Sequence, residues 1–200
     1  MHTLVLASQS PRRRDLLTKA GFEFEVASVE ISEIPKENLS LRAQIEDLAQ
    51  QKAQALVESP KLPKTPNILL LSADTVVVID DQILNKPRDL SESESHIRLL
   101  SGRTHQVITG VCLWDLGADK KVVTHEIAEV TFRKLPDEEI HAYVQSRDGM
   151  DKAGAYGIQS VGATFISNLK GSLENVMGLP VALVERLIEE NGWKISRRKS

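Results

Sequence analysis

The run from Asn67 to Asp80 (NILLLSADTVVVID) constrains the fold of this chain more than any other segment. It is almost continuously apolar, so it lacks the alternation of apolar and polar residues that a strand with one solvated face shows. A strand of this kind is buried on both faces. We therefore expect central strands here, interrupted at Ser72-Ala73-Asp74, where polar residues enter the run.

Helices and further strands surround this run along the chain. Thr3 to Ala7 predicts a short buried strand, and Ser10, Pro11 and Gly21 mark the start and end of a helix after it. The remaining patterns predict helices over 40–57, 91–100 (with Ser91 and Glu94 as a capping box), 136–145 and 180–192, long strands over 106–116 and 121–132, a hairpin turn at 80–81, a glycine-rich loop over 149–157 and a strand over 163–168. The expected class is α/β with a partly antiparallel sheet, in a single domain over residues 1–200 with a basic tail from about residue 194.

Composition narrows the function class. The chain has 25 basic and 28 acidic residues and a net charge of −3, which argues against a protein that coats nucleic acid through overall basicity. No stretch approaches the ~18 uninterrupted apolar residues of a membrane span, and the N-terminus lacks the layout of a signal peptide. The single cysteine, Cys112, lies in an apolar run and is expected to be a buried thiol. We expect a cytoplasmic protein without nucleic-acid or membrane partners.

Three consecutive arginines stand in the opening turn of the first expected helix. The macrodipole makes that end positive, so each cation there costs roughly 0.3–1 kcal/mol. Arg12, Arg13 and Arg14 together therefore suggest an anion bound by guanidinium and backbone N–H groups. The alternative is a solvated basic turn in which Arg14 pairs with a later carboxylate.

Asp74 and Lys52 are the next candidates. An aspartate at the end of a buried strand is costly without a metal, a base or hydrogen-bond partners, although a turn aspartate that caps its own backbone is an alternative. Lys52 follows the apolar spacing of its helix, so its ammonium either snorkels to water or points at an anion. By themselves, Glu33 and Lys86 look like ordinary loop and surface residues, and His105 looks like a structural histidine.

Several segments in a fixed order resemble the Maf family of nucleoside triphosphate pyrophosphatases. They are ASQSPRR, SADT, NKPRD, LSGRTHQVITG, DKAGAYGIQ and GLP, and they span about residues 3 to 190. The resemblance implies hydrolysis of dTTP and UTP to the monophosphate and pyrophosphate, with a divalent metal cation (Mg²⁺ or Mn²⁺). It also implies an elongated mixed sheet flanked by helices, with a cleft between two lobes, similar to the fold of inosine triphosphatases. A homodimer is in keeping with the family, although no apolar helix face marks an interface.

The resemblance also implies roles for individual residues. Asp74 falls on the catalytic position and, with Glu33, on the metal site. Phosphate contacts fall on Ser8, Arg13, Lys52, Lys86 and Lys152, and the choice of base falls on Arg12, Thr75 and Gln159. The chain departs from the family pattern at Ser32, where an acid commonly precedes the glutamate, at Ser160, where glycine is common, and at Leu173, where tyrosine is frequent.

Physical arguments agree with these roles. A nucleoside triphosphate carries about four negative charges, and an excess of local cations on a chain of net charge −3 is what an anion site needs. The amide of Gln159 offers one donor and one acceptor, which match the Watson–Crick edge of thymine or uracil. Two alternatives stay open: the same reaction on 7-methyl-GTP or another modified nucleotide, and a non-catalytic nucleotide sensor that regulates cell division.

Overall fold

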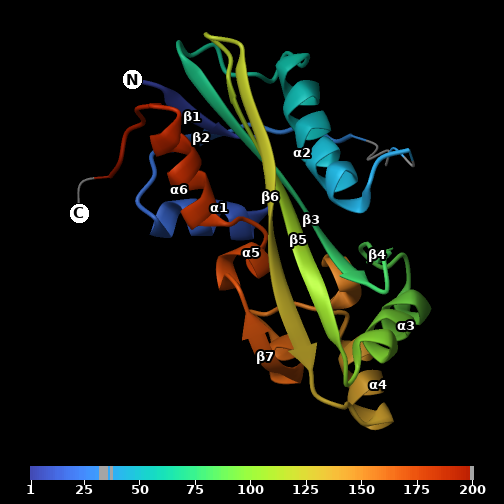
Figure 1. Cartoon of the computed structure of the whole chain (residues 1–200). Helices are drawn as coiled ribbons and strands as arrows, with labels where there is room; N and C mark the ends of the chain where they lie inside the picture. The colour runs from blue at the N-terminus through green and yellow to red at the C-terminus, as the bar shows by residue number, and fades with distance from the viewer. Residues whose placement is uncertain (32–35, 37, 199–200) are drawn as a thin grey trace. The chain divides into compact units, whose positions relative to one another are not determined.

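The computed structural model describes residues 1–31, 36 and 38–198 (Figure 1). The elements in chain order are β1 (Thr3–Leu6), α1 (Pro11–Lys19), β2 (Phe24–Val26), α2 (Leu41–Val57), β3 (Ile68–Ile79), β4 (Gln82–Leu84), α3 (Leu90–Leu100), β5 (Thr104–Asp115), β6 (Lys120–Phe132), α4 (Asp137–Ser146), the 3-10 helices η1 (Ala153–Ala155) and η2 (Val161–Phe165), β7 (Ile166–Lys170), α5 (Leu173–Met177) and α6 (Val181–Glu190). This confirms the α/β class.

In the described residues, seven strands form one mixed sheet in the order β2-β1-β3-β5-β6-β7, with β4 paired to β3. β1 is parallel to both β2 and β3, whereas the β3–β4 and β6–β7 pairs are antiparallel. The expected hairpin turn is confirmed: Asp80 and Asp81 have φ values of 50° and 61°, the left-handed conformation that a tight two-residue turn requires. The sheet is therefore partly parallel and partly antiparallel, as expected.

The chain divides into two compact units. Unit 1 comprises residues 1–74, 109–126 and 178–200, and unit 2 comprises residues 75–108 and 127–177. Each unit has its own buried apolar cluster. The single domain expected over the whole chain stays a prediction, because compactness alone does not show which parts fold independently.

In unit 1, helices cover both faces of the strands. Figure 1 shows α1 and α6 on one side of the strands and α2 on the other. The backbone of α2 comes so close to β5 that a Cβ on Gly110 would lie 2.5 Å from the carbonyl oxygen of Ile45, so only glycine fits there. Cys112 is buried in the apolar cluster of unit 1, as expected. The basic tail returns to this unit, with Arg197 stacked 3.6 Å above the ring of Phe22.

The expected interruption at Ser72-Ala73-Asp74 is wrong, because β3 is one continuous strand. Ser72 and Asp74 alternate onto the same face of the strand, and α2 supplies a partner for each. The Ser72 hydroxyl donates to the carbonyl oxygen of Ala49 at 2.6 Å, and the Lys52 ammonium contacts Asp74. The strand continues because its buried polar groups are satisfied by a neighbouring helix.

Unit 2 is built around edge-to-face aromatic contacts. The ring centroids of His105 and Phe132 lie 5.1 Å apart, those of Phe132 and Tyr156 4.8 Å, and those of Tyr143 and Phe165 4.8 Å. These rings join the ends of β5 and β6 to α4 and to the segment that contains η1 and η2. Through Tyr156 they attach the glycine-rich loop 149–157 to the buried cluster of unit 2.

One local prediction in unit 2 is wrong, and another is confirmed only in part. The N-cap of α3 is Asp89, whose carboxylate accepts the N–H of Glu92 at 2.8 Å, while Glu92 accepts the N–H of Arg88 at 2.7 Å. This reciprocal pair begins two residues before the expected Ser91, since aspartate caps as well as serine does. Of the strand expected over 163–168, residues 166–168 lie in β7, whereas residues 163–165 belong to η2. The short elements β2 and α5 were not predicted.

None of the described helices combines the length and the apolar character needed to cross a lipid bilayer.

Candidate active site

The segment between β1 and α1 holds two of the predicted phosphate-binding residues in contact. The buried Ser8 hydroxyl accepts hydrogen bonds from the backbone N–H of Ser10 (3.1 Å) and from Nη1 of Arg13 (3.3 Å). Nε of Arg13 donates to the carbonyl oxygen of Gly178 at 2.7 Å. Arg13 is thus anchored within unit 1, and the solvated-turn alternative fits only Arg14, which is exposed.

The start of α1 has the features of an anion site. Pro11 occupies the first turn, and the side chain of Ser10 makes no capping hydrogen bond among the described residues. The first turn contains no acidic side chain, and Arg12 there is half-buried. Because the helix N-terminus is itself positive, a negatively charged ligand would be stabilised there.

Lys52 and Asp74 form an ion pair between α2 and β3. The Lys52 ammonium contacts Oδ1 of Asp74, and the two side chains are 20% and 6% exposed. Lys52 follows the buried Leu48 by one helical turn, so the helix directs its ammonium toward the sheet. The contact favours the anion-directed interpretation of Lys52 over snorkelling. The alternative of a turn aspartate at position 74 is wrong, because Asp74 lies within a strand.

The resemblance implies a divalent metal cation bound by Asp74 and Glu33. Glu33 lies outside the described residues. Within the described part of the chain, no three His, Cys, Asp or Glu side chains come together as a metal cage would require. Mg²⁺, however, commonly uses one or two carboxylates together with substrate phosphates and waters. The buried carboxylate of Asp74 fits a cation of that kind as one such ligand.

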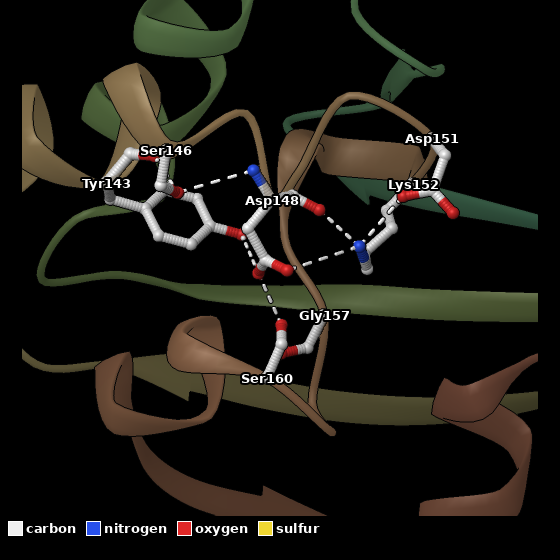
Figure 2. Close-up of polar contacts among 7 residues, drawn as sticks. All are labelled: Tyr143, Ser146, Asp148, Asp151, Lys152, Gly157 and Ser160. Carbon is white, nitrogen blue, oxygen red and sulfur yellow. Dashed lines mark hydrogen bonds and ion pairs between the residues drawn. The ribbon is translucent and has the colours of Figure 1, made fainter.

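In unit 2, the ammonium of Lys152 is held by the glycine-rich loop (Figure 2). It donates to the carbonyl oxygen of Asp148 and, at 2.8 Å, to Oδ1 of Asp151, and it lies 3.6 Å from Oδ1 of Asp148. The Lys152 side chain is 17% exposed, whereas that of Asp151 is 65% exposed. Lys152 is therefore a fixed cation with one exposed counter-ion.

The other predicted residues of unit 2 are more open. Gln159 lies in a turn five residues after Gly154 and is exposed, and Lys86 is exposed after β4. Thr75 is half-buried and directly follows Asp74 in β3. The structure thus brings Ser8 to Arg13 and Lys52 to Asp74 within unit 1. In unit 2 it places Lys152 and Gln159 on one short segment.

Sequence reasoning missed a group of residues around Asp148. Oδ2 of Asp148 accepts hydrogen bonds from the hydroxyls of Tyr143 (3.1 Å) and Ser160. Burial and the neighbouring Asp148 raise the pKa of Tyr143 above its usual range. Asp148 in the sequence RDGMDK is only a weak signal for this group. Tyr143 has the pattern of an ordinary core residue of a helix.

His105 is a structural histidine, as expected. Its Nε2 shares a hydrogen bond of 2.8 Å with the hydroxyl of Tyr156, and burial lowers the pKa of His105 to about 4. Burial also raises the pKa of the Cys112 thiol to about 11. A neutral, enclosed imidazole and an enclosed thiol are poorly suited to act as base or nucleophile.

Comparison with known proteins places the chain in a family. The family described as "Maf-like protein" matches residues 3–191. Among similar proteins named dTTP/UTP pyrophosphatase, that of Bdellovibrio bacteriovorus is 44% identical, over 94% of this chain and 97% of its own length. That of Ruminiclostridium cellulolyticum is 41% identical (98% and 99%), and that of Bacillus pumilus is 40% identical (96% and 98%). This chain belongs to the Maf-like family.

Proposed function

We propose that this chain hydrolyses dTTP and UTP to the nucleoside monophosphate and pyrophosphate. The observation that carries the proposal is the ion pair that Lys52 of α2 forms with the buried Asp74 of β3. Stability does not demand such a pair, because apolar residues of similar volume often do as well or better. A carboxylate at this position is therefore better explained by chemistry. The proposal is supported by the names of relatives 40–44% identical over nearly the whole chain.

The proposed reaction is the attack of water on the α-phosphorus. The water oxygen bonds to phosphorus, and the bond from phosphorus to the oxygen that bridges to the β-phosphate breaks. Pyrophosphate leaves with that oxygen, and the carboxylate of Asp74 takes the proton of the water as a general base. Lys52 holds the carboxylate in place by its contact with Oδ1.

The cations that the resemblance names would bind the phosphates. Ser8, Arg12 and Arg13 are suited to the triphosphate because the start of α1 adds backbone N–H groups to the guanidinium donors. The phosphate-binding part assigned to Lys152 and Lys86 stays a prediction. Asp74 would hold a divalent cation, which would neutralise charge on the phosphate oxygens. The part assigned to Glu33 stays a prediction.

The choice of base is assigned to Gln159, Thr75 and Arg12. A glutamine amide pairs with the donor and acceptor of thymine or uracil, whereas guanine presents two adjacent donors that suit a carboxylate. The exposed side chain of Gln159 is free to turn toward a base. The reaction would serve as house-cleaning of nucleotide pools, and we place it in the cytoplasm, in keeping with a single buried thiol.

The test is pyrophosphate release from dTTP, UTP, CTP, dGTP, ATP and 7-methyl-GTP, with Mg²⁺ and with a chelator. We expect rapid release from dTTP and UTP, lost in Asp74→Asn while dTTP still binds. Asp115→Asn is the matched control, because Asp115 is a buried carboxylate of unit 1 that pairs with His2 at 3.1 Å.

Each other outcome has a defined meaning. Near-normal turnover by Asp74→Asn would contradict its role as base. Release only from a guanine nucleotide would keep the reaction and refute the assignment of the base. Binding of nucleotides without any release would instead indicate a nucleotide sensor.

A further inference from the structure

One carboxylate, that of Asp148, contacts both the lysine and the turn that the proposed function uses in unit 2 (Figure 2). The two oxygens divide the contacts. Oδ2 accepts from the hydroxyls of Tyr143 and Ser160, and Oδ1 lies 3.6 Å from the ammonium of Lys152. The carboxylate therefore joins three parts of the chain that lie up to 17 positions apart in the printed sequence, from Tyr143 to Ser160.

Tyr143 supplies a fixed anchor for this carboxylate. Its ring is buried against Phe165 with centroids 4.8 Å apart, so its hydroxyl has little freedom. The backbone holds Asp148 as well: its N–H donates to Oγ of Ser146 at 3.3 Å, and that hydroxyl donates to the carbonyl oxygen of Tyr143 at 2.6 Å. Asp148 is thus attached to the end of α4 through both its side chain and its backbone.

Ser160 ties the turn to this anchor. The turn Gly157–Ser160 is closed by a hydrogen bond from the N–H of Ser160 to the carbonyl oxygen of Gly157. The Ser160 hydroxyl has one proton and two acceptors in reach, the Asp148 carboxylate and the Gly157 carbonyl oxygen at 3.2 Å. The charged acceptor forms the stronger bond. Ser160 is also a position where the chain departs from the glycine common in the family pattern.

Lys152 and this turn are in direct contact. A Cβ on Gly157 would lie 2.6 Å from Cε and 2.7 Å from Cδ of Lys152, so the stem of the lysine crosses the backbone of the turn. Gln159 lies between Gly157 and Ser160. A change at Asp148 therefore reaches the ammonium at one end and the amide of Gln159 at the other.

We propose that Asp148 is a positioning residue that sets both the ammonium of Lys152 and the turn that carries Gln159. The inference rests on the proposed function, in which Lys152 binds phosphate and Gln159 binds the base. Asp148 itself would contact neither the phosphate nor the base. Its carboxylate links phosphate binding to base selection because it holds the Lys152 ammonium and the turn of Gln159 in one arrangement. Ser160 is the residue through which Asp148 acts on base selection.

The test compares Asp148→Asn with Asp151→Asn. Asparagine keeps an acceptor for Tyr143 and Ser160 and removes the charge that faces Lys152. We expect the KM for dTTP to rise about tenfold, because residues in one hydrogen-bond and charge network are commonly coupled by an energy of that size. The kcat should change less. Asp151→Asn removes the same charge from an exposed partner of the same lysine and should change KM less than about twofold.

A double-mutant cycle separates the two arms. In a Lys152→Ala background, adding Asp148→Asn should raise KM no further, because the lysine through which Asp148 acts is gone. Ser160→Gly should lower the preference for dTTP over dGTP by about threefold and leave the melting temperature within about 2 °C. This variant removes only the small, half-buried side chain of Ser160, so it also serves if Asp148→Asn does not fold.

The inference is overturned if Asp148→Asn lowers the melting temperature while KM and selectivity stay at wild-type values, because the role is then structural only. Additive effects of Asp148→Asn and Lys152→Ala on KM would also overturn it. A wild-type chain that binds dTTP without turnover refutes the proposed function, and the same cycle is then read from the Kd for dTTP. A wild-type chain that neither binds nor turns over dTTP refutes both.

Discussion

Replacing Lys52 with methionine tests the buried ion pair through the stability of unit 1. Methionine keeps most of the volume of the lysine stem but leaves the Asp74 carboxylate without that ammonium. The Asp74 side chain is 6% exposed, so water can replace little of the lost contact. Removal of one member of a buried ion pair typically costs about 3–5 kcal/mol.

The expected cost is near the lower limit, about 3 kcal/mol, because Lys52 is itself 20% exposed and water reaches part of the site. With an m value of about 2 kcal/mol/M in urea, that loss lowers the unfolding midpoint by about 1.5 M. The double variant Lys52→Met with Asp74→Asn contains no unpaired buried charge. It should therefore be more stable than Lys52→Met alone, by about 2 kcal/mol.

Tryptophan fluorescence during urea unfolding measures this effect. The chain has 2 tryptophans, Trp114 and Trp193, and both are buried in unit 1 together with the ion pair. Asp115→Asn gives the cost of an unrelated buried carboxylate as a control. If the losses for Lys52→Met and Asp74→Asn simply add in the double variant, the two side chains are not coupled and the reasoning is refuted.

Three further predictions concern unit 2. Folding lowers the pKa of His105 from 6.5 to about 4. The folded state is therefore most stable, with respect to this group, above pH 6.5, and it loses that stability as the pH falls toward 4. At 1.36 kcal/mol per pKa unit, this loss of stability reaches at most about 3–4 kcal/mol. In melts followed by near-UV circular dichroism, His105→Gln should flatten the pH dependence, and a wild-type pH dependence in the variant would contradict this. Gly157→Ala should displace Lys152 and raise the KM for dTTP about fivefold at an unchanged melting temperature, as steady-state pyrophosphate release would measure, and an unchanged KM would show that the lysine stem does not need that space. Gln159→Glu should shift the preference toward dGTP in competition between dTTP and dGTP, and unchanged selectivity would show that Gln159 does not contact the base.

Much of the fold could be predicted because its signals act over a few residues. Pro11 begins α1, and the pair Asp80-Asp81 forms the turn between β3 and β4. The same local character explains the errors at α3, where Asp89 and Glu92 match a capping box as well as Ser91 and Glu94 do. A local signal shows that a helix begins nearby but does not choose between two equivalent caps.

The candidate site was less accessible to such reasoning. The residues named from the resemblance include Lys52 and Asp74, but their contact spans 22 positions. It depends on how α2 packs across β3. The same packing gives Ser72 its acceptor, and this is why polar residues that were expected to end a strand lie within one. No periodicity of β3 alone carries that information.

By itself the sequence determined the α/β class, most helix starts, the buried thiol of Cys112 and the family resemblance. These depend on local conformational preference, on apolar burial and on motifs that are contiguous in the chain. Only the tertiary structure decided that Asp74 stays inside a strand, and that Asp148 holds Lys152 and Ser160 together. The physical reason is that a buried polar group is stable only with a partner, and these partners come from elements distant in sequence.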